Sequence, residues 1–180
     1  AAIGLVLVLL ATAAYALDGF AYASEIEAGQ SLGEKQFRRF TDSLWAGAAL
    51  SIASAAIIVL FVKLFHNQLF QTLTDFRDVV TEANALMTWF TWILLALCWS
   101  YWLDGVFIGL TKTLDMCIAM FLATTCGWVG SLWYIGTDSL DQLMAAFLIF
   151  AVIRSISLGF RLPAVVEEIR NLSIPTHPRS

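Results

Sequence analysis

The sequence has few charged residues, since Asp, Glu, Lys and Arg together make up 13% of its 180 residues. Histidine is scarcer, with only His66 and His177, and neither lies in an apolar run where it could ligate a haem. The formal net charge of −4 argues against a nucleic-acid partner. The sequence also shows no phosphate-cradling motif, no His/Cys cluster with metal-ligand spacing and no buried acid pair. We therefore expect no enzyme, no metal and no other cofactor.

Cysteine is also rare, and its three positions, Cys98, Cys117 and Cys126, all lie in apolar segments. They are typical of small buried hydrophobic residues and not of a disulfide framework. Apolar residues, in contrast, make up 59% of the chain, and its mean hydropathy is +0.78. This composition predicts a multi-pass integral membrane protein.

Long apolar runs predict four membrane spans, at residues 1–17, 44–62, 84–103 and 143–161. Between the second and third spans, residues 69–82 have apolar side chains at helical spacing and polar side chains on the other face. This pattern predicts an amphipathic linker helix at the membrane interface. A simple solvated connector is the alternative.

A fifth apolar stretch, residues 111–138, is charge-free from Met116 to Thr137 and is long enough to span a bilayer. Gly127 and Gly130 lie in its middle, where two glycines favour a break in a helix. We interpret the stretch as a re-entrant pore helix followed by a filter-like loop. An ordinary transmembrane helix with two packing glycines is the alternative. The expected fold class is thus an all-α membrane protein with four transmembrane helices, a re-entrant pore helix and an interfacial linker helix.

Arg154 lies inside the last apolar run. A charge there costs roughly 2.5–3.5 kcal/mol on insertion scales and faces protein or water. Arg154 therefore either faces a pore or pairs with a neighbouring helix. For this order of spans, five Lys and Arg residues fall on one side of the membrane (Lys63, Arg77, Arg161, Arg170, Arg179) and four on the other (Lys35, Arg38, Arg39, Lys112). This difference is too small to fix the orientation of the protein in the membrane.

Several short pieces resemble the second half of polycystins, which are TRP-type cation channels. These pieces, in order, are Ala53-Ala-Ile-Ile-Val-Leu-Phe-Val-Lys-Leu-Phe65, residues 72–90, Val106-Phe107-Ile-Gly109, Thr113-Leu114 and Val165-Val-Glu-Glu-Ile-Arg170. The resemblance implies that residues 1–65 hold the last two helices of a voltage-sensor-like domain. Residues 66–83 would be the interfacial linker helix, residues 84–172 the pore module and residues 173–180 a tail.

The resemblance also implies roles for individual residues in a tetrameric channel. The pore filter would be formed by Thr125, Cys126, Gly127, Trp128 and Gly130. Asp115 and Asp138 would lie at the pore mouth and attract cations such as calcium. The gate region of the last helix would include Arg154, Gly159, Arg161 and Pro163.

Two departures from conducting polycystins affect this prediction. Those channels carry Leu-Gly-Asp in the filter, where this chain has Cys126, Gly127 and Trp128. Arg154 and Arg161 also add positive charge, which would repel cations in a pore. The resemblance therefore implies a poorly conducting subunit in a homo- or heterotetramer, surrounded by lipid in the plasma or ciliary membrane. A small, non-catalytic accessory subunit of a large membrane complex is the alternative function.

Overall fold

The computed structural model describes residues 2–136 and 138–173, which form helices joined by short turns. In chain order the elements are α1 (Ala2–Gly33), α2 (Phe37–Leu73), α3 (Arg77–Ala85), α4 (Met87–Gly109), α5 (Thr113–Leu122), the π-helical segment Ala123–Val129, α6 (Gly130–Ile135) and α7 (Leu140–Ser173). The all-α membrane class predicted from the sequence is confirmed. The predicted tail lies outside the described residues, except for Ser173.

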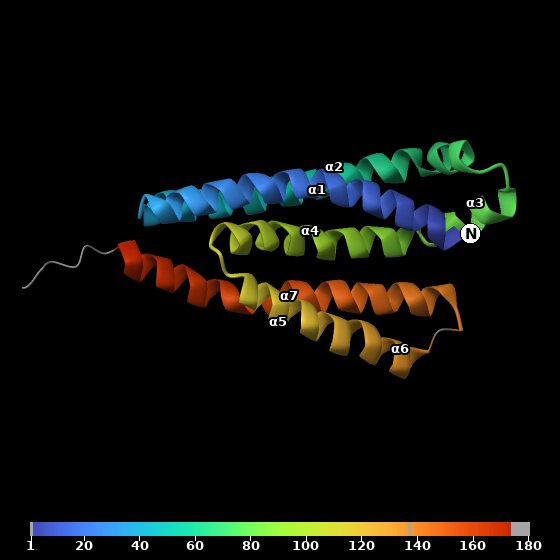
Figure 1. The fold of residues 1–180 in the computed structure, drawn as a ribbon. Coiled ribbons are helices and arrows are strands. Elements are labelled where there is room, and N and C mark those ends of the chain that lie inside the picture. Colours follow the sequence, from blue (N-terminus) through green and yellow to red (C-terminus); the bar gives the residue numbers. More distant parts are fainter. Residues whose placement is uncertain (1, 137, 174–180) are drawn as a thin grey trace, which may run out of the picture.

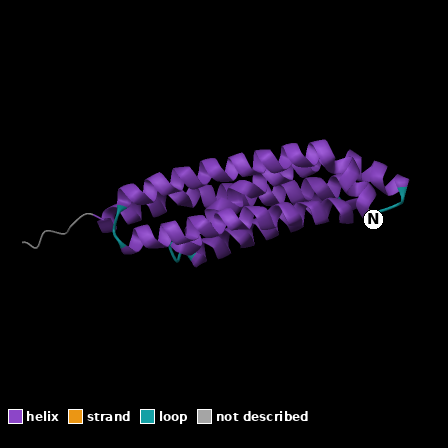
Figure 2. Cartoon of the chain, turned by 90° about the horizontal axis from the view of Figure 1, so that it is seen from above, coloured by secondary structure: helices purple, strands orange, loops and turns teal. Residues whose placement is uncertain are grey.

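The long helices lie side by side and alternate in direction along one elongated bundle (Figures 1 and 2). α1, α4 and α7 run one way, whereas α2 and the rod made by α5 and α6 run the other way. Five helices within the described residues are long and apolar enough to cross a membrane: Ala2–Gly33, Phe37–Leu73, Met87–Gly109, Thr113–Ile135 and Leu140–Ser173. The ends of the bundle therefore correspond to the two membrane surfaces.

The re-entrant loop predicted between residues 111 and 138 is not present, because Thr113–Ile135 is one uninterrupted helical rod. Gly127 lies in the π-helical segment and Gly130 begins α6, so the chain passes both glycines as a helix and not as a loop. Within the membrane, a helix keeps its backbone groups hydrogen-bonded, which an open loop cannot do. The rod starts at one end of α4 and finishes toward the other (Figure 1). The alternative interpretation, a transmembrane helix with packing glycines, is the correct one.

Other predicted boundaries also differ from the structure. The polar residues that follow residue 17 continue α1 as far as Gly33, so helix replaces much of the predicted connector. The predicted linker helix is divided, because α2 continues to Leu73 and α3 begins only at Arg77. Proline lacks the N–H that would bond the carbonyl four residues earlier, yet α7 continues through Pro163 to Ser173.

Two apolar clusters fill the bundle, one toward each end. The first joins residues from α1, α2, α3, α4 and α7, including Leu17, Phe70 and Phe90. The second includes Phe40 of α2 and Phe107 of α4. Buried apolar contacts thus connect residues on both sides of the boundaries predicted at 65 and 83. The predicted division into domains stays a prediction.

α1 and α4 approach each other closely at two glycines of α4. A Cβ atom on Gly105 would overlap the carbonyl oxygen of Ala21, and one on Gly109 would overlap that of Glu25. Small residues four positions apart allow the backbones of membrane helices to approach in this way. The two glycines of α4 therefore hold α1 against it over one full helical turn.

We expect Gly105→Ala to destabilise the protein, because the added methyl group would overlap the Ala21 carbonyl and push α1 away from α4. Overpacking of this kind costs about 1–3 kcal/mol. Thermal unfolding of the purified full-length protein in detergent measures the effect. Gly19→Ala is the matched control, since a Cβ on Gly19 of α1 has no atom within 4 Å. Equal unfolding temperatures for the two variants would contradict the close contact.

We also expect residues 112 and 139 to lie on opposite sides of the membrane, because they flank the rod Thr113–Ile135. In a variant without Cys98, Cys117 and Cys126, single cysteines at these two positions can be labelled with a membrane-impermeant maleimide. One should react from outside the cell and the other only after permeabilisation. Labelling of both positions from the same side of the membrane would contradict a crossing helix and support the re-entrant loop instead.

Candidate functional site: an ion pair inside the bundle

A carboxylate and a guanidinium meet between α4 and α7, inside the apolar bundle. Nη2 of Arg154 donates to Oδ2 of Asp104 at 2.5 Å. The side chains are only 18% and 12% exposed, respectively. Charged residues within membrane helices are rare and mark substrate or ion pathways. The pair is therefore the leading candidate for a functional site.

Neighbouring contacts on α4 and α7 hold the pair in place. Oγ of Ser155, next to Arg154, donates to the carbonyl of Ala96 at 2.7 Å and ties α7 to α4. Gly105, next to Asp104, lies against the backbone of α1. α4 is thus fixed on both sides of the ion pair, which restricts how the two charges can move.

Hydrogen bonding around the pair is incomplete. Oδ1 of Asp104 is buried and has no hydrogen-bond partner within the described residues, and the same holds for Oγ of Ser100 and Nε1 of Trp102. Buried polar atoms are usually paired, so an unpaired carboxylate oxygen needs an explanation such as a bound water, ion or proton. Oδ1 of Asp104 can accept a hydrogen bond or coordinate a small cation.

A second carboxylate, that of Asp18, lies on α1, three residues before Ala21, whose carbonyl meets Gly105 of α4. It lies on an exposed side of α1, where Tyr15 is 77% and Tyr22 is 64% exposed. Their spacing of three or four residues puts these side chains on one face of the helix. This polar face must contact protein or water if the helix crosses a membrane.

The predicted filter residues do not converge on one point. Oγ1 of Thr125 donates to the carbonyl of Phe121 at 2.7 Å, and Cys126 is exposed. Gly127 packs against the backbone of Phe150 in α7. Trp128 meets Phe147 edge to face at the rim of a shallow cavity, with 6.0 Å between the ring centroids. Gly130 lies in α6, next to this π-helical turn.

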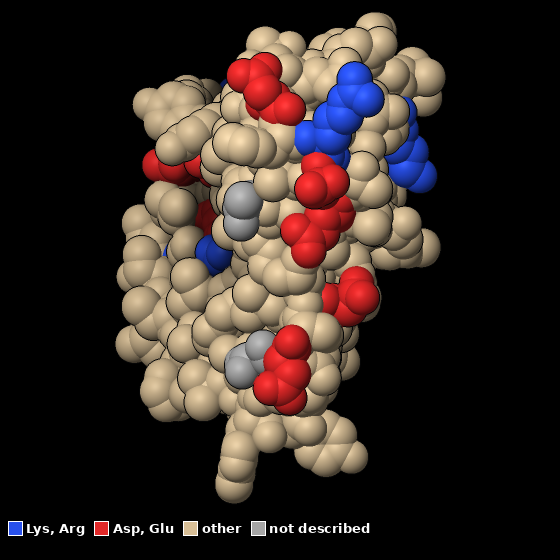
Figure 3. Space-filling model, turned by 90° about the vertical axis from the view of Figure 1, so that its right-hand side faces the viewer, with Lys and Arg blue, Asp and Glu red and all other residues tan. Residues whose placement is uncertain are grey.

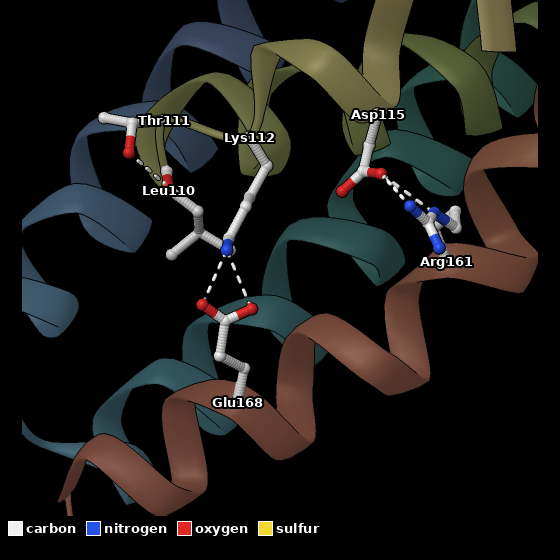
Figure 4. Close-up of polar contacts among 6 residues, drawn as sticks. All are labelled: Leu110, Thr111, Lys112, Asp115, Arg161 and Glu168. Carbon is white, nitrogen blue, oxygen red and sulfur yellow. Dashed lines mark hydrogen bonds and ion pairs between the residues drawn. The ribbon is translucent and has the colours of Figure 1, made fainter. Parts of the chain in front are cut away.

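Asp115, predicted at the pore mouth, pairs with Arg161, predicted in the gate region, and Lys112 pairs with Glu168 at the same end of the bundle (Figure 4). Nε of Arg161 donates to Oδ1 of Asp115 at 2.8 Å. Nζ of Lys112 donates to both carboxylate oxygens of Glu168, at 2.6 and 2.7 Å. These contacts join the start of α5 to α7 on either side of Pro163. Surface pairs of this kind contribute little to stability, about 0–1 kcal/mol each.

The remaining predicted residues lie apart from this cluster. Asp138 is at the far end of the rod from Asp115, and its backbone N–H donates to Oε1 of Gln142 at 2.8 Å. Gly159 faces the indole of Trp99, where a Cβ would have 3.8 Å to Nε1. Within residues 2–136 and 138–173, no three His, Cys, Asp or Glu side chains gather in a way that could hold a metal ion.

Comparison with known proteins identifies the family. The MatE family model matches residues 1–133, which is most of the chain. The chain belongs to the MatE family. This is a family of multidrug and toxic compound extrusion transporters, in line with the expectation that the chain is not an enzyme. The chain is therefore a multi-pass integral membrane protein.

One curated relative of this MatE chain is DNA damage-inducible protein F of Escherichia coli (strain K12). The two are 30% identical over 160 residues, which cover 84% of this chain and 33% of the relative. The chain thus spans about a third of the length of the relative it matches. No solved structure matches the chain.

Membership in the MatE family overturns the polycystin resemblance. The predicted cation channel, its tetramer of channel subunits and its ciliary membrane are wrong, and the accessory-subunit alternative gains no support. The filter, mouth and gate roles followed only from that resemblance, and they stay untested predictions. The resemblance misled because most of the shared pieces were short, and membrane proteins of unrelated families share such pieces by chance.

The third span predicted from the sequence stops at residue 103 and so leaves Asp104 just outside the membrane. α4 in fact extends to Gly109, which brings Asp104 into the bundle. The Gly105/Gly109 spacing that follows is typical of packed membrane helices. The prediction that Arg154 pairs with a neighbouring helix, one of two left open, is correct.

We expect Arg154→Ala to lower stability strongly, because Asp104 would remain buried without a counter-charge. Removing one partner of a buried ion pair costs about 3–5 kcal/mol. Thermal unfolding in detergent should show a large decrease. The double variant Asp104→Leu/Arg154→Leu should recover most of it, since apolar residues can replace such a pair.

Arg170→Ala is the matched control for this loss, because Arg170 is 61% exposed and lies 3.7 Å from Glu167. It should unfold at nearly the parent temperature. If Arg154→Ala and Arg170→Ala were equally stable, the ion pair would not be needed to hold α4 and α7 together.

Proposed function

We propose that this chain forms part of a membrane efflux transporter, and that the Asp104–Arg154 pair couples transport to a proton or a small cation. The observation that carries the proposal is the buried carboxylate of Asp104: one oxygen bonds Arg154, and the other has no partner among the residues that the structure describes. Family membership supports transport, and the charges inside the bundle support this site. Since the chain matches a third of its relative, further helices would complete the transporter.

Coupling at Asp104 would follow from the charge balance of the pair. While Asp104 is ionised, its charge offsets that of Arg154 and the two side chains hold α4 to α7. A proton or cation on Oδ1 would weaken the attraction of the carboxylate for Arg154. α7 could then shift relative to α4, whereas Gly105 and Gly109 keep α4 fixed against α1. An ion at Asp104 would in this way change the relative positions of the helices.

The orientation of the bundle follows from its five crossings. One end carries Lys35, Arg38, Arg39, Lys112, Arg161 and Arg170, whereas the other carries Lys63 and Arg77. Cytoplasmic ends of membrane helices are enriched in Lys and Arg. We infer that the end with the α1–α2 turn faces the cytoplasm. Figure 3 views the opposite end, where acidic side chains are prominent.

We expect Asp104→Asn to abolish transport, because asparagine keeps the shape of aspartate and loses its charge. The double variant Asp104→Asn/Arg154→Gln leaves no buried charge without a counter-charge, so it should stay folded and also fail to transport. Ethidium efflux from cells that express the full-length protein measures transport, and it should fall to the level of cells without the protein. Glu167→Gln, which removes a carboxylate that is 61% exposed, should leave efflux unchanged. Efflux by Asp104→Asn at the parent rate would refute the coupling role.

A further inference from the structure

A polar cavity of about 520 Å³ lies where α2 ends and α3 begins. Its lining includes the amides of Asn67, Gln71 and Asn84, the hydroxyl of Thr81 and the charged groups of Asp75 and Arg77. None of these residues belongs to the ion pair inside the bundle. The cavity is at the end of the bundle where α2 meets α3, which is the end that Figure 3 views.

Exposed apolar side chains border this cavity. Leu73, the last residue of α2, is 51% exposed, and Phe76, which precedes α3, is 74% exposed. α3 itself is amphipathic, with Val80 and Ala83 buried. An amphipathic helix with bulky apolar neighbours lies at the boundary between headgroups and acyl chains. The cavity therefore opens at the depth of lipid headgroups, which favours a lipid over a soluble ligand.

The groups in the cavity are free to bind a ligand of mixed charge. Within the described residues, neither Asp75 nor Arg77 forms an ion pair. Nδ2 of Asn84 donates to Oδ1 of Asn67 at 2.6 Å, which leaves Oδ1 of Asn84 buried with no donor. The cavity thus offers the guanidinium of Arg77 as a donor to an anion. For a cation that can donate hydrogen bonds, it offers the carboxylate of Asp75 and the amide oxygen of Asn84 as acceptors.

We propose that this cavity binds the headgroup of phosphatidylethanolamine. The guanidinium of Arg77 would hold the phosphate, because its fork of donors matches phosphate oxygens. The carboxylate of Asp75 and Oδ1 of Asn84 would accept hydrogen bonds from the primary ammonium. A choline headgroup cannot donate these hydrogen bonds, and a glycerol headgroup brings no positive charge to Asp75. The proposal is independent of the transport function and of Asp104.

The test is lipid-dependent thermal stability of the delipidated full-length protein in detergent, with each lipid added at the same concentration. Phosphatidylethanolamine should raise the unfolding temperature more than phosphatidylcholine or phosphatidylglycerol does. Arg77→Gln and Asp75→Asn should each weaken its apparent affinity by about tenfold. The comparison uses the shift caused by lipid, so that a change in the stability of the variant itself does not affect the result.

Arg170→Gln is the control, since it removes an exposed guanidinium from the other end of the bundle, and it should keep the full lipid effect. Equal shifts with all three lipids, or an unchanged preference in Arg77→Gln, would overturn the proposal. A larger shift with phosphatidylglycerol would show an anion site and also overturn it. An equal shift with soluble phosphoethanolamine would assign the cavity to a soluble ligand instead of a lipid.

Discussion

The backbone contact between α1 and α4 is the constraint on which the rest of the bundle depends. Gly105 and Gly109 have no side chains, so the carbonyls of Ala21 and Glu25 can approach α4 closely. In a membrane, moving apolar side chains from lipid to protein releases little free energy, so close packing of this kind is a main source of helix association. The same contact fixes Asp104, the residue next to Gly105, between α1 and α7.

The ion pair of Asp104 and Arg154 is stable only because both partners are present. Either charge alone would be costly in an apolar bundle, and together they offset each other at 2.5 Å. A pair of this kind contributes little net stability compared with apolar residues of similar size, so stability alone does not account for its presence. The proposed role in transport would account for both the charge of Asp104 and its oxygen that has no partner among the described residues. The surface pairs of Lys112 and Asp115 with α7 are exposed on at least one side and suit a simpler structural role.

The rod from Thr113 to Ile135 illustrates where local sequence rules failed. Two glycines predicted a break, because glycine weakens a helix in water. In this bundle Gly127 lets α7 approach, and Oγ of Ser131 donates to the carbonyls of Gly127 and Trp128 in the wide π-helical turn. Packing and a local hydrogen bond thus outweighed intrinsic propensity.

The sequence by itself determined that this protein is helical and lies in a membrane. A chain with 59% apolar residues partitions into lipid, where backbone groups are satisfied within helices. It also determined the approximate positions of four spans, because each apolar run must be long enough to cross. Only the tertiary structure decided that the fifth stretch crosses as well and that Arg154 meets Asp104, which is fifty residues earlier in the chain. Pairing between distant helices depends on how their surfaces fit together in space, and no local pattern of residues encodes that fit.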